Sequence, residues 1–420
     1  MNIESLEASA VSTSTVFSRS LTLTQWIWFI SIPLLLSASP PSEPVVARME
    51  MKLAEGEKLV NVIEKGDLLT VLEEREEDYV ILTHDGFKGA VDKVNAVRII
   101  ESGEIYSELI KEHPKEGRFY TLRASAWLAL EKPDEALADF DKAIELGYEE
   151  AHAFSSRGLF HASRGDMEKA IADYNRAMEI DSDDVAPLVN RAAVFMNQGE
   201  FDQAIADYTK ALEKEPDSIS LHSQRAIAHK ATGEFDEAIS DYDAILDKHP
   251  ENVAAIMGRG YIHFQQREHQ QAVDDFAKAI ELNPQDAVAY NNRGFNLYQL
   301  KKYAAAIKDY DEAIGIAPKY GLALQNRAWL LATAEDESLR DPKLAVESAK
   351  AACELSNYGN LSELSALAAA LAANGQFAEA VGWQEKVAKM VAENYREFAE
   401  KTLERYRNEQ PFTTSPNRSK

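Results

Sequence analysis

Apolar and polar positions alternate with a helical period over residues 117–400, and the pattern recurs every 34 residues. The string AIADY stands at 170–174 and again at 204–208. In this register, the eighth position of each unit is small: Ala124, Gly158, Ala192, Ala226, Gly260, Gly294 and Ala328. The twentieth position is alanine (Ala136, Ala170, Ala204, Ala238, Ala272, Ala306), and the twenty-fourth is aromatic (Phe140, Tyr174, Tyr208, Tyr242, Phe276, Tyr310). The sequence therefore predicts consecutive pairs of amphipathic helices that approach closely where the small residues lie.

Proline closes several units, at Pro216, Pro250, Pro284 and Pro318, and ends the second helix because its ring clashes with the preceding turn. With this period and its small, aromatic and proline positions, the repeat resembles the tetratricopeptide repeat over 117–400. The resemblance implies a mostly α, right-handed α-solenoid of about seven helix-turn-helix units, because one unit cannot bury its apolar face alone. We expect residues 101–116 to form an N-terminal capping helix, and 401–420 to hold the end of a capping helix and a disordered tail.

One late unit departs from the spacing. Its second-helix alanine is Ala345, five residues beyond the expected position 340, so the turn between its helices is predicted to be longer. A further unit restores the spacing with Ala368 and Ala380.

Two charged positions recur inside the units. The seventh position is arginine (Arg123, Arg157, Arg191, Arg225, Arg259, Arg293, Arg327), and the twenty-third is aspartate (Asp139, Asp173, Asp207, Asp241, Asp275, Asp309). The last unit has Leu367 and Trp383 instead, so both charges disappear together. We expect each arginine to form a forked ion pair with an aspartate, within a unit or between units, that sets the register of the helices.

Residues 41–100 differ from the repeats, since short Val/Ile/Leu runs are separated by turn signals at Lys65-Gly66-Asp67 and Asp85-Gly86. This spacing predicts a small antiparallel β-barrel. The stretches VIEKGDLLTVLEE, DYVILT and GFKGAV resemble a bacterial Src-homology-3-like domain. Some relatives of that kind bind cell-wall peptides and others are spacers, and we assign no ligand.

Residues 1–40 carry an apolar run over 21–39, followed by small residues and prolines. The order is typical of a signal peptide, and its length also fits an uncleaved signal anchor. We therefore expect an exported chain in the periplasm or cell envelope, with 21–39 as a possible membrane anchor.

Partner-binding candidates come from the family resemblance, which implies that the first helix of each unit lines an inner face. Aromatic residues gather there at the ninth and twelfth positions of three consecutive units, and two of these units have an amide at the fifth position. Rigid rings beside adaptable amides are what a peptide-binding surface needs. The candidate residues are Tyr261, Phe264, Phe295, Tyr298, Trp329, Asn291 and Gln325.

Composition and motifs exclude other classes. The formal net charge is −25, which argues against nucleic acid as a partner. No phosphate-binding loop, nucleophile elbow or metal-ligand spacing is present, so we expect no enzyme activity and no cofactor. The single cysteine, Cys353, is expected to be a buried structural thiol. Three functions remain: a scaffold that binds a protein or peptide in the repeat groove, an envelope-binding protein that recognises its ligand through the β-barrel, or an accessory subunit of an enzyme complex.

Overall fold

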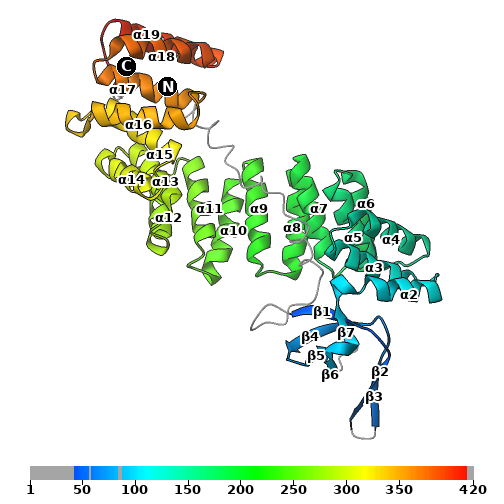
Figure 1. The fold of residues 1–420 in the computed structure, drawn as a ribbon. Coiled ribbons are helices and arrows are strands. Elements are labelled where there is room, and N and C mark those ends of the chain that lie inside the picture. The colour runs from blue at the N-terminus through cyan, green and yellow to red at the C-terminus, as the bar shows by residue number, and fades with distance from the viewer. Residues whose placement is uncertain (1–41, 56–57, 84–87, 414–420) are drawn as a thin grey trace. The chain divides into compact units, whose positions relative to one another are not determined.

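The computed structural model describes residues 42–55, 58–83 and 88–413 of the 420-residue chain. The predicted leader therefore lies outside the described residues, as do positions 414–420. The described residues fall into two compact units that divide between Leu221 and His222. Figure 1 shows their elements, with strands in the first unit and paired helices in both.

The first unit begins with an antiparallel β region. Five strands form a sheet in the order β6-β5-β4-β1-β7, and β2 pairs with β3 in a separate hairpin. Alternate strand residues such as Val45, Val71 and Ile81 share one buried core, because successive side chains point to opposite faces of a sheet. Within the described residues, β6 and β7 are edge strands. The strands are β1 (Ser42–Ala47), β2 (Met51–Glu55), β3 (Lys58–Ile63), β4 (Leu68–Glu74), β5 (Asp78–Leu82), β6 (Lys88–Asp92) and β7 (Ala96–Arg98).

Helix α2 (Gly103–Glu112) joins the β region to the first helix pair. Its buried Tyr106 donates a hydrogen bond of 3.1 Å from the phenol to the carbonyl of Gly66, in the turn between β3 and β4. Gly66 has φ +90°, and a Cβ there would lie 2.5 Å from a Leu109 methyl, so the turn requires glycine. Lys65 and Glu108 add an ion pair of 2.7 Å beside it.

The remaining helices of the first unit form three antiparallel pairs. The pairs are α3 (Gly117–Ala129) with α4 (Pro133–Glu145), α5 (Ala151–Ser163) with α6 (Met167–Ile180), and α7 (Ala186–Gln198) with α8 (Phe201–Lys214).

The second unit continues the same pattern. Its pairs are α9 (Ile219–Thr232) with α10 (Phe235–Lys248), α11 (Val253–Gln265) with α12 (His269–Leu282), α13 (Ala287–Gln299) with α14 (Tyr303–Ile316), α15 (Gly321–Thr333) with α16 (Pro342–Leu355), and α17 (Leu361–Ala373) with α18 (Phe377–Met390). A final helix, α19 (Glu393–Arg407), packs on α18. The described helices thus make eight pairs, where the repeat count predicted about seven.

The repeat positions pack as the sequence predicts. The aromatic residues of the twenty-fourth position and the alanines of the eighth and twentieth are all buried. At Gly294 a Cβ would lie 2.9 Å from the ring of Tyr310 and 3.1 Å from Cβ of Asp309. The two helices of this unit are therefore in contact through a ring packed against a glycine.

The lengthened turn is also confirmed. Helix α15 ends at Thr333, a short 3₁₀ helix η5 occupies Glu337–Leu339, and α16 begins at Pro342. Arg340 closes the turn, because its Nε donates to the carbonyl of Ala334 at 2.7 Å.

Candidate partner-binding surface

Arginine–aspartate pairs form within each of six units, as the covariation of the two positions indicates. In every case the arginine Nε and Nη2 donate to the two carboxylate oxygens of the aspartate sixteen residues later, at 2.6–3.1 Å. The aspartates are buried and the arginines are partly exposed. This two-bond geometry fixes the angle between the planar groups as well as their distance.

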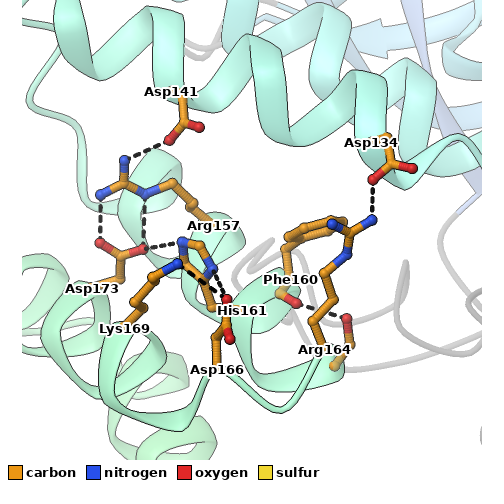
Figure 2. Close-up of polar contacts among 10 residues, drawn as sticks. Asp134, Asp141, Arg157, Phe160, His161, Arg164, Asp166, Lys169 and Asp173 are labelled. Carbon is orange, nitrogen blue, oxygen red and sulfur yellow. Dashed lines mark hydrogen bonds and ion pairs between the residues drawn. The ribbon is translucent and has the colours of Figure 1, made fainter.

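Three of the repeat arginines also form an ion pair with the preceding helix pair. Figure 2 shows Arg157 between Asp173 of its own unit and Asp141 of the unit before, whose carboxylate accepts from Nη1 at 2.9 Å. Arg259 repeats this contact with Asp243 at 2.6 Å, and Arg327 repeats it with Asp311 at 2.8 Å. One guanidinium thus joins three helices, so the pairing that the sequence left open is both within and between units.

These contacts keep the guanidinium groups charged. The hydrogen bonds that Arg259 donates to Asp275 and Asp243 raise its pKa, and those that Arg157 donates to Asp173 and Asp141 raise the pKa of Arg157. The arginines therefore hold the first helices at a fixed orientation relative to their neighbours. That orientation places the candidate aromatic side chains, which stand two and five positions after each arginine.

Four of the candidate aromatic residues form a continuous row, which we call the aromatic strip: Tyr261 and Phe264 on α11 with Phe295 and Tyr298 on α13. Ring centroids are 5.8 Å apart for Tyr261–Phe264, 5.4 Å for Phe264–Phe295 and 6.5 Å for Phe295–Tyr298. All four side chains are half-buried. Tyr303, at the start of α14, extends the row with a centroid 5.6 Å from Tyr298.

The two candidate amides lie beneath the surface. Asn291 is 1% exposed and Gln325 is 6% exposed. Asn326 donates from Nδ2 to Oδ1 of Asn291 at 3.0 Å, and Gln325 donates to Asn326 at 3.4 Å. In this structure they connect α13 to α15, because a buried amide requires a partner. Their role in binding a partner stays a prediction.

Trp329, the fifth candidate ring, belongs to a different cluster. Its ring centroid lies 5.6 Å from that of Phe412, which follows α19, and Phe412 lies 5.9 Å from Phe398 on α19. Among the described residues, the indole N–H of Trp329 is buried without a hydrogen-bond partner. Phe412 stands outside the repeat, so the sequence pattern gave no signal for this contact.

Lys230 of α9 begins the aromatic strip. Its Nζ lies 5.2 Å from the centroid of the Tyr261 ring, and burial lowers the pKa of the ammonium. Among the described residues no carboxylate forms an ion pair with it, although the chain holds 70 acidic residues. Sequence reasoning missed Lys230 as a site residue, although it occupies the same repeat position as Phe264 and Tyr298.

The cysteine and two of the histidines make contacts within the helical fold. Cys353 is buried, and burial raises the pKa of its thiol to about 12. His229 and His263 place Nδ1 at 2.7 Å from Glu234 and Glu268, at the start of the following helix. Over the residues described, three or more His, Cys, Asp or Glu side chains nowhere gather in a way that could hold a metal ion.

A transmembrane helix needs about 20 consecutive, largely apolar residues. No helix in the described part of the chain is both long and apolar enough to span a membrane. The candidate segment 21–39 lies outside that part.

The paired helices and their shared polar and aromatic positions define a helical-repeat protein. Family profiles described as tetratricopeptide repeat match residues 104–147, 121–185, 186–218, 223–287, 287–320 and 364–393, which together cover more than half of the chain. The chain therefore belongs to the tetratricopeptide-repeat family. Such repeats bind protein or peptide partners and typically serve as non-catalytic scaffolds.

Solved structures of other repeat proteins are similar to parts of this chain. The C-terminal part of a tetratricopeptide-repeat protein from Cytophaga hutchinsonii is 18% identical, with a TM-score of 0.50, and the match covers 54% of this chain and 94% of that one. A repeat protein from Parabacteroides merdae is 19% identical, with a TM-score of 0.44 and coverage of 61% and 99%. YrrB, described as having an unusual peptide-binding site, is 23% identical, with a TM-score of 0.39 and coverage of 44% and 95%.

Proposed function

We propose that the chain is a protein-interaction scaffold that binds a segment of a partner protein along the aromatic strip. The observation that carries the proposal is the surplus of rings. In the six units from α3–α4 to α13–α14, the aromatic residue of the twenty-fourth position is buried in the core. Tyr261, Phe264, Phe295 and Tyr298 come in addition, touch one another and remain half-buried.

Ring rows of this kind are suited to anchoring a peptide. Aromatic residues supply large contact areas with few rotatable bonds, so little conformational entropy is lost on binding. Truncating such an anchor typically weakens binding by 2 kcal/mol or more, about thirtyfold in Kd.

Lys230 indicates which charge the partner segment carries. The Lys230 ammonium is partly removed from water and, among the described residues, forms no ion pair with a carboxylate. Such an ammonium gains more from an anionic group than a fully hydrated lysine does. We therefore infer that the partner segment carries aromatic or aliphatic anchors followed by an acidic group that reaches Lys230. The acidic remainder of the chain repels such a segment everywhere else, which adds selectivity for the strip.

The test is selection of peptide ligands from a displayed random library by the full chain. We expect enriched peptides to combine apolar anchors with an Asp, Glu or terminal carboxylate.

Variants of the aromatic strip then test the site. The double variant Tyr261→Ala, Phe295→Ala should bind an enriched peptide at least tenfold more weakly in Kd. Lys230→Met should weaken acidic peptides only. Met196→Ala, a side chain at the twelfth position of a unit distant in sequence, is the matched control and should change nothing. Circular dichroism checks the fold of each variant.

Two outcomes contradict the proposal. Equal binding by the double variant excludes the strip as the site. Loss of binding when residues 42–101 are deleted, with the strip intact, places recognition in the β region instead. Stable co-purification of the chain with an enzyme, independent of the strip, favours the accessory-subunit function.

We also propose that the β region has a Src-homology-3-like fold and that residues 21–39 direct export or anchoring. The first rests on the strand and turn spacing of 41–100, and the second on the apolar run. Cell fractionation with N-terminal sequencing of the mature chain distinguishes a cleaved leader from an anchor, and recovery from the cytoplasm with an intact N-terminus contradicts both.

A further inference from the structure

The described end of the chain turns back onto the helices before it. After α19, Glu409 has φ +53°, and Gln410 N–H donates to the carbonyl of Arg405 at 2.9 Å. The Arg405 guanidinium then donates to the carbonyl of Pro411 at 3.0 Å. These bonds direct Phe412 toward Trp329 of α15, more than 80 positions earlier in the sequence.

Phe412 enters a pocket lined by residues of four helices. Trp329 comes from α15, Ser365 from α17, Gln384 from α18, and Phe398 and Tyr406 from α19. The amide of Gln384 is engaged, because its Nε2 donates to the carbonyl of Ala399 at 3.0 Å. Most of the other lining residues are apolar, and this hydrogen bond joins α18 to α19.

The fit of Phe412 is incomplete in two respects. A cavity of about 40 Å³ remains beside it, which exceeds the space that one water molecule needs. The Trp329 indole N–H also stays unpaired among the described residues, whereas that of Trp127 donates to Asp139 at 3.0 Å. A buried donor without an acceptor is unfavourable, so an occupant that filled the cavity and accepted this hydrogen bond would bind more tightly.

We propose that this pocket is a second binding site, for an aromatic side chain, and that the chain's own Phe412 occupies it as an exchangeable ligand. Residues 410–413 close the site in the resting protein. A partner segment whose ring carries a hydrogen-bond acceptor displaces them by filling the cavity and accepting from Trp329. The site is separate from the aromatic strip, so neither proposal depends on the other.

The experiment uses a chain that ends at Asn408, which keeps all of α19, and a synthetic peptide of residues 409–420. Binding is followed by tryptophan fluorescence, with Trp329→Phe identifying the responding residue among the five tryptophans. We expect the peptide to bind the shortened chain at least tenfold more tightly than the full chain, because the full chain already holds Phe412 at a high effective concentration. A peptide with Phe412→Ala should bind at least tenfold more weakly, and one with Phe412→Tyr more tightly.

A second variant guards against misfolding of the shortened chain. Full-length Phe412→Ala should bind the peptide as the shortened chain does, and Tyr261→Ala with Phe295→Ala should leave peptide binding unchanged. The proposal is overturned if the peptide fails to bind either opened chain, or if the Phe412→Ala peptide binds as well as the native one. Loss of peptide binding in the strip variant would show that the two sites are one.

Discussion

Arg327 differs from the other repeat arginines in the partner that its own unit provides. Ser348 stands in the place of the aspartate, and its hydroxyl lies 3.1 Å from Nε and 3.0 Å from Nη2. The five-residue insertion before α16 is absorbed in the turn, so the serine still reaches the arginine. Asp311 of the preceding unit is then the one carboxylate paired with Arg327 among the described residues.

This difference predicts unequal effects of one substitution at two equivalent positions. Asp243→Ala leaves Arg259 with Asp275. Asp311→Ala instead leaves the Arg327 guanidinium, whose side chain is 13% exposed, without a charged partner among the described residues. Both aspartates are about half exposed, and both substitutions gain the same helix propensity. We expect Asp311→Ala to lower the free energy of unfolding by about 1–2 kcal/mol more than Asp243→Ala does.

Urea denaturation of the two variants provides the measurement. Equal midpoints would mean that the contact between units contributes only screened surface charge. Restoring an acid in the unit itself, with Ser348→Asp, should rescue Asp311→Ala.

The ionisation of the Cys353 thiol allows a second prediction at the residue scale. Burial raises its thiol pKa to about 12, so at pH 8 the folded chain holds almost no thiolate, which is the reactive form. The raised pKa also means that the proton is lost more easily from the unfolded chain. This group therefore stabilises the fold fully below the unfolded thiol pKa, and that contribution falls as pH rises toward the folded value.

A disulfide reagent at pH 8 should consequently react with Cys353 only on unfolding. We expect the folded chain to react at least a hundredfold more slowly than a free thiol peptide. In denaturant, the reagent should label one thiol per chain. Fast reaction in the folded state would show that α16 opens locally.

At the scale of elements, the first helix of each unit has two kinds of position, which differ in the side chains that they accept. The eighth position meets a ring of its own unit, and in three units only glycine is present there: Gly158, Gly260 and Gly294. The ninth and twelfth positions are more variable and carry the aromatic strip in α11 and α13. Some of them, such as Tyr298, also pack against the core cluster that holds the ring of their own unit.

Gly294→Val tests the close approach of α13 and α14. A Cβ at 2.9 Å from the Tyr310 ring forces the helices apart, and overpacking of this kind lowers stability by about 1–3 kcal/mol. Gly315→Val in α14 is the control, because a Cβ there meets nothing within 4 Å and the change replaces glycine inside a helix. We expect only the first variant to lower the melting temperature; a similar fall for both would assign the effect to valine itself.

For the whole molecule, the sequence could predict those contacts that recur with the 34-residue period. The helix pairs, the long turn after Thr333 and the arginine–aspartate forks follow from spacing, because a 34-residue period repeats the same contacts. Burial of Asn291 and Gln325 was not predictable, since it depends on how α13 meets α15. The contact of Phe412 with Trp329 joins a non-repeating end to the solenoid, where no period operates.

Helix α19 ends the repeat array and buries apolar surface that α17 and α18 would otherwise expose. Ala399 and Tyr406 are at most 2% exposed, and Val387 of α18 is 3% exposed. Burial of one large apolar side chain contributes about 1.5–3 kcal/mol. In a repeat array each unit contacts only its neighbours, so loss of the cap acts first on the last pair.

A chain ending at Met390 should therefore lose amide-exchange protection in α17 and α18 while α3–α8 keep theirs. Hydrogen exchange read by mass spectrometry measures each helix pair in the same sample, and a chain ending at Asn408 is the matched control because it retains α19. We expect protection of the last pair to fall at least tenfold in the shorter chain only. A uniform loss over every pair would mean that the array unfolds as one cooperative block, in which the cap stabilises distant and adjacent units alike.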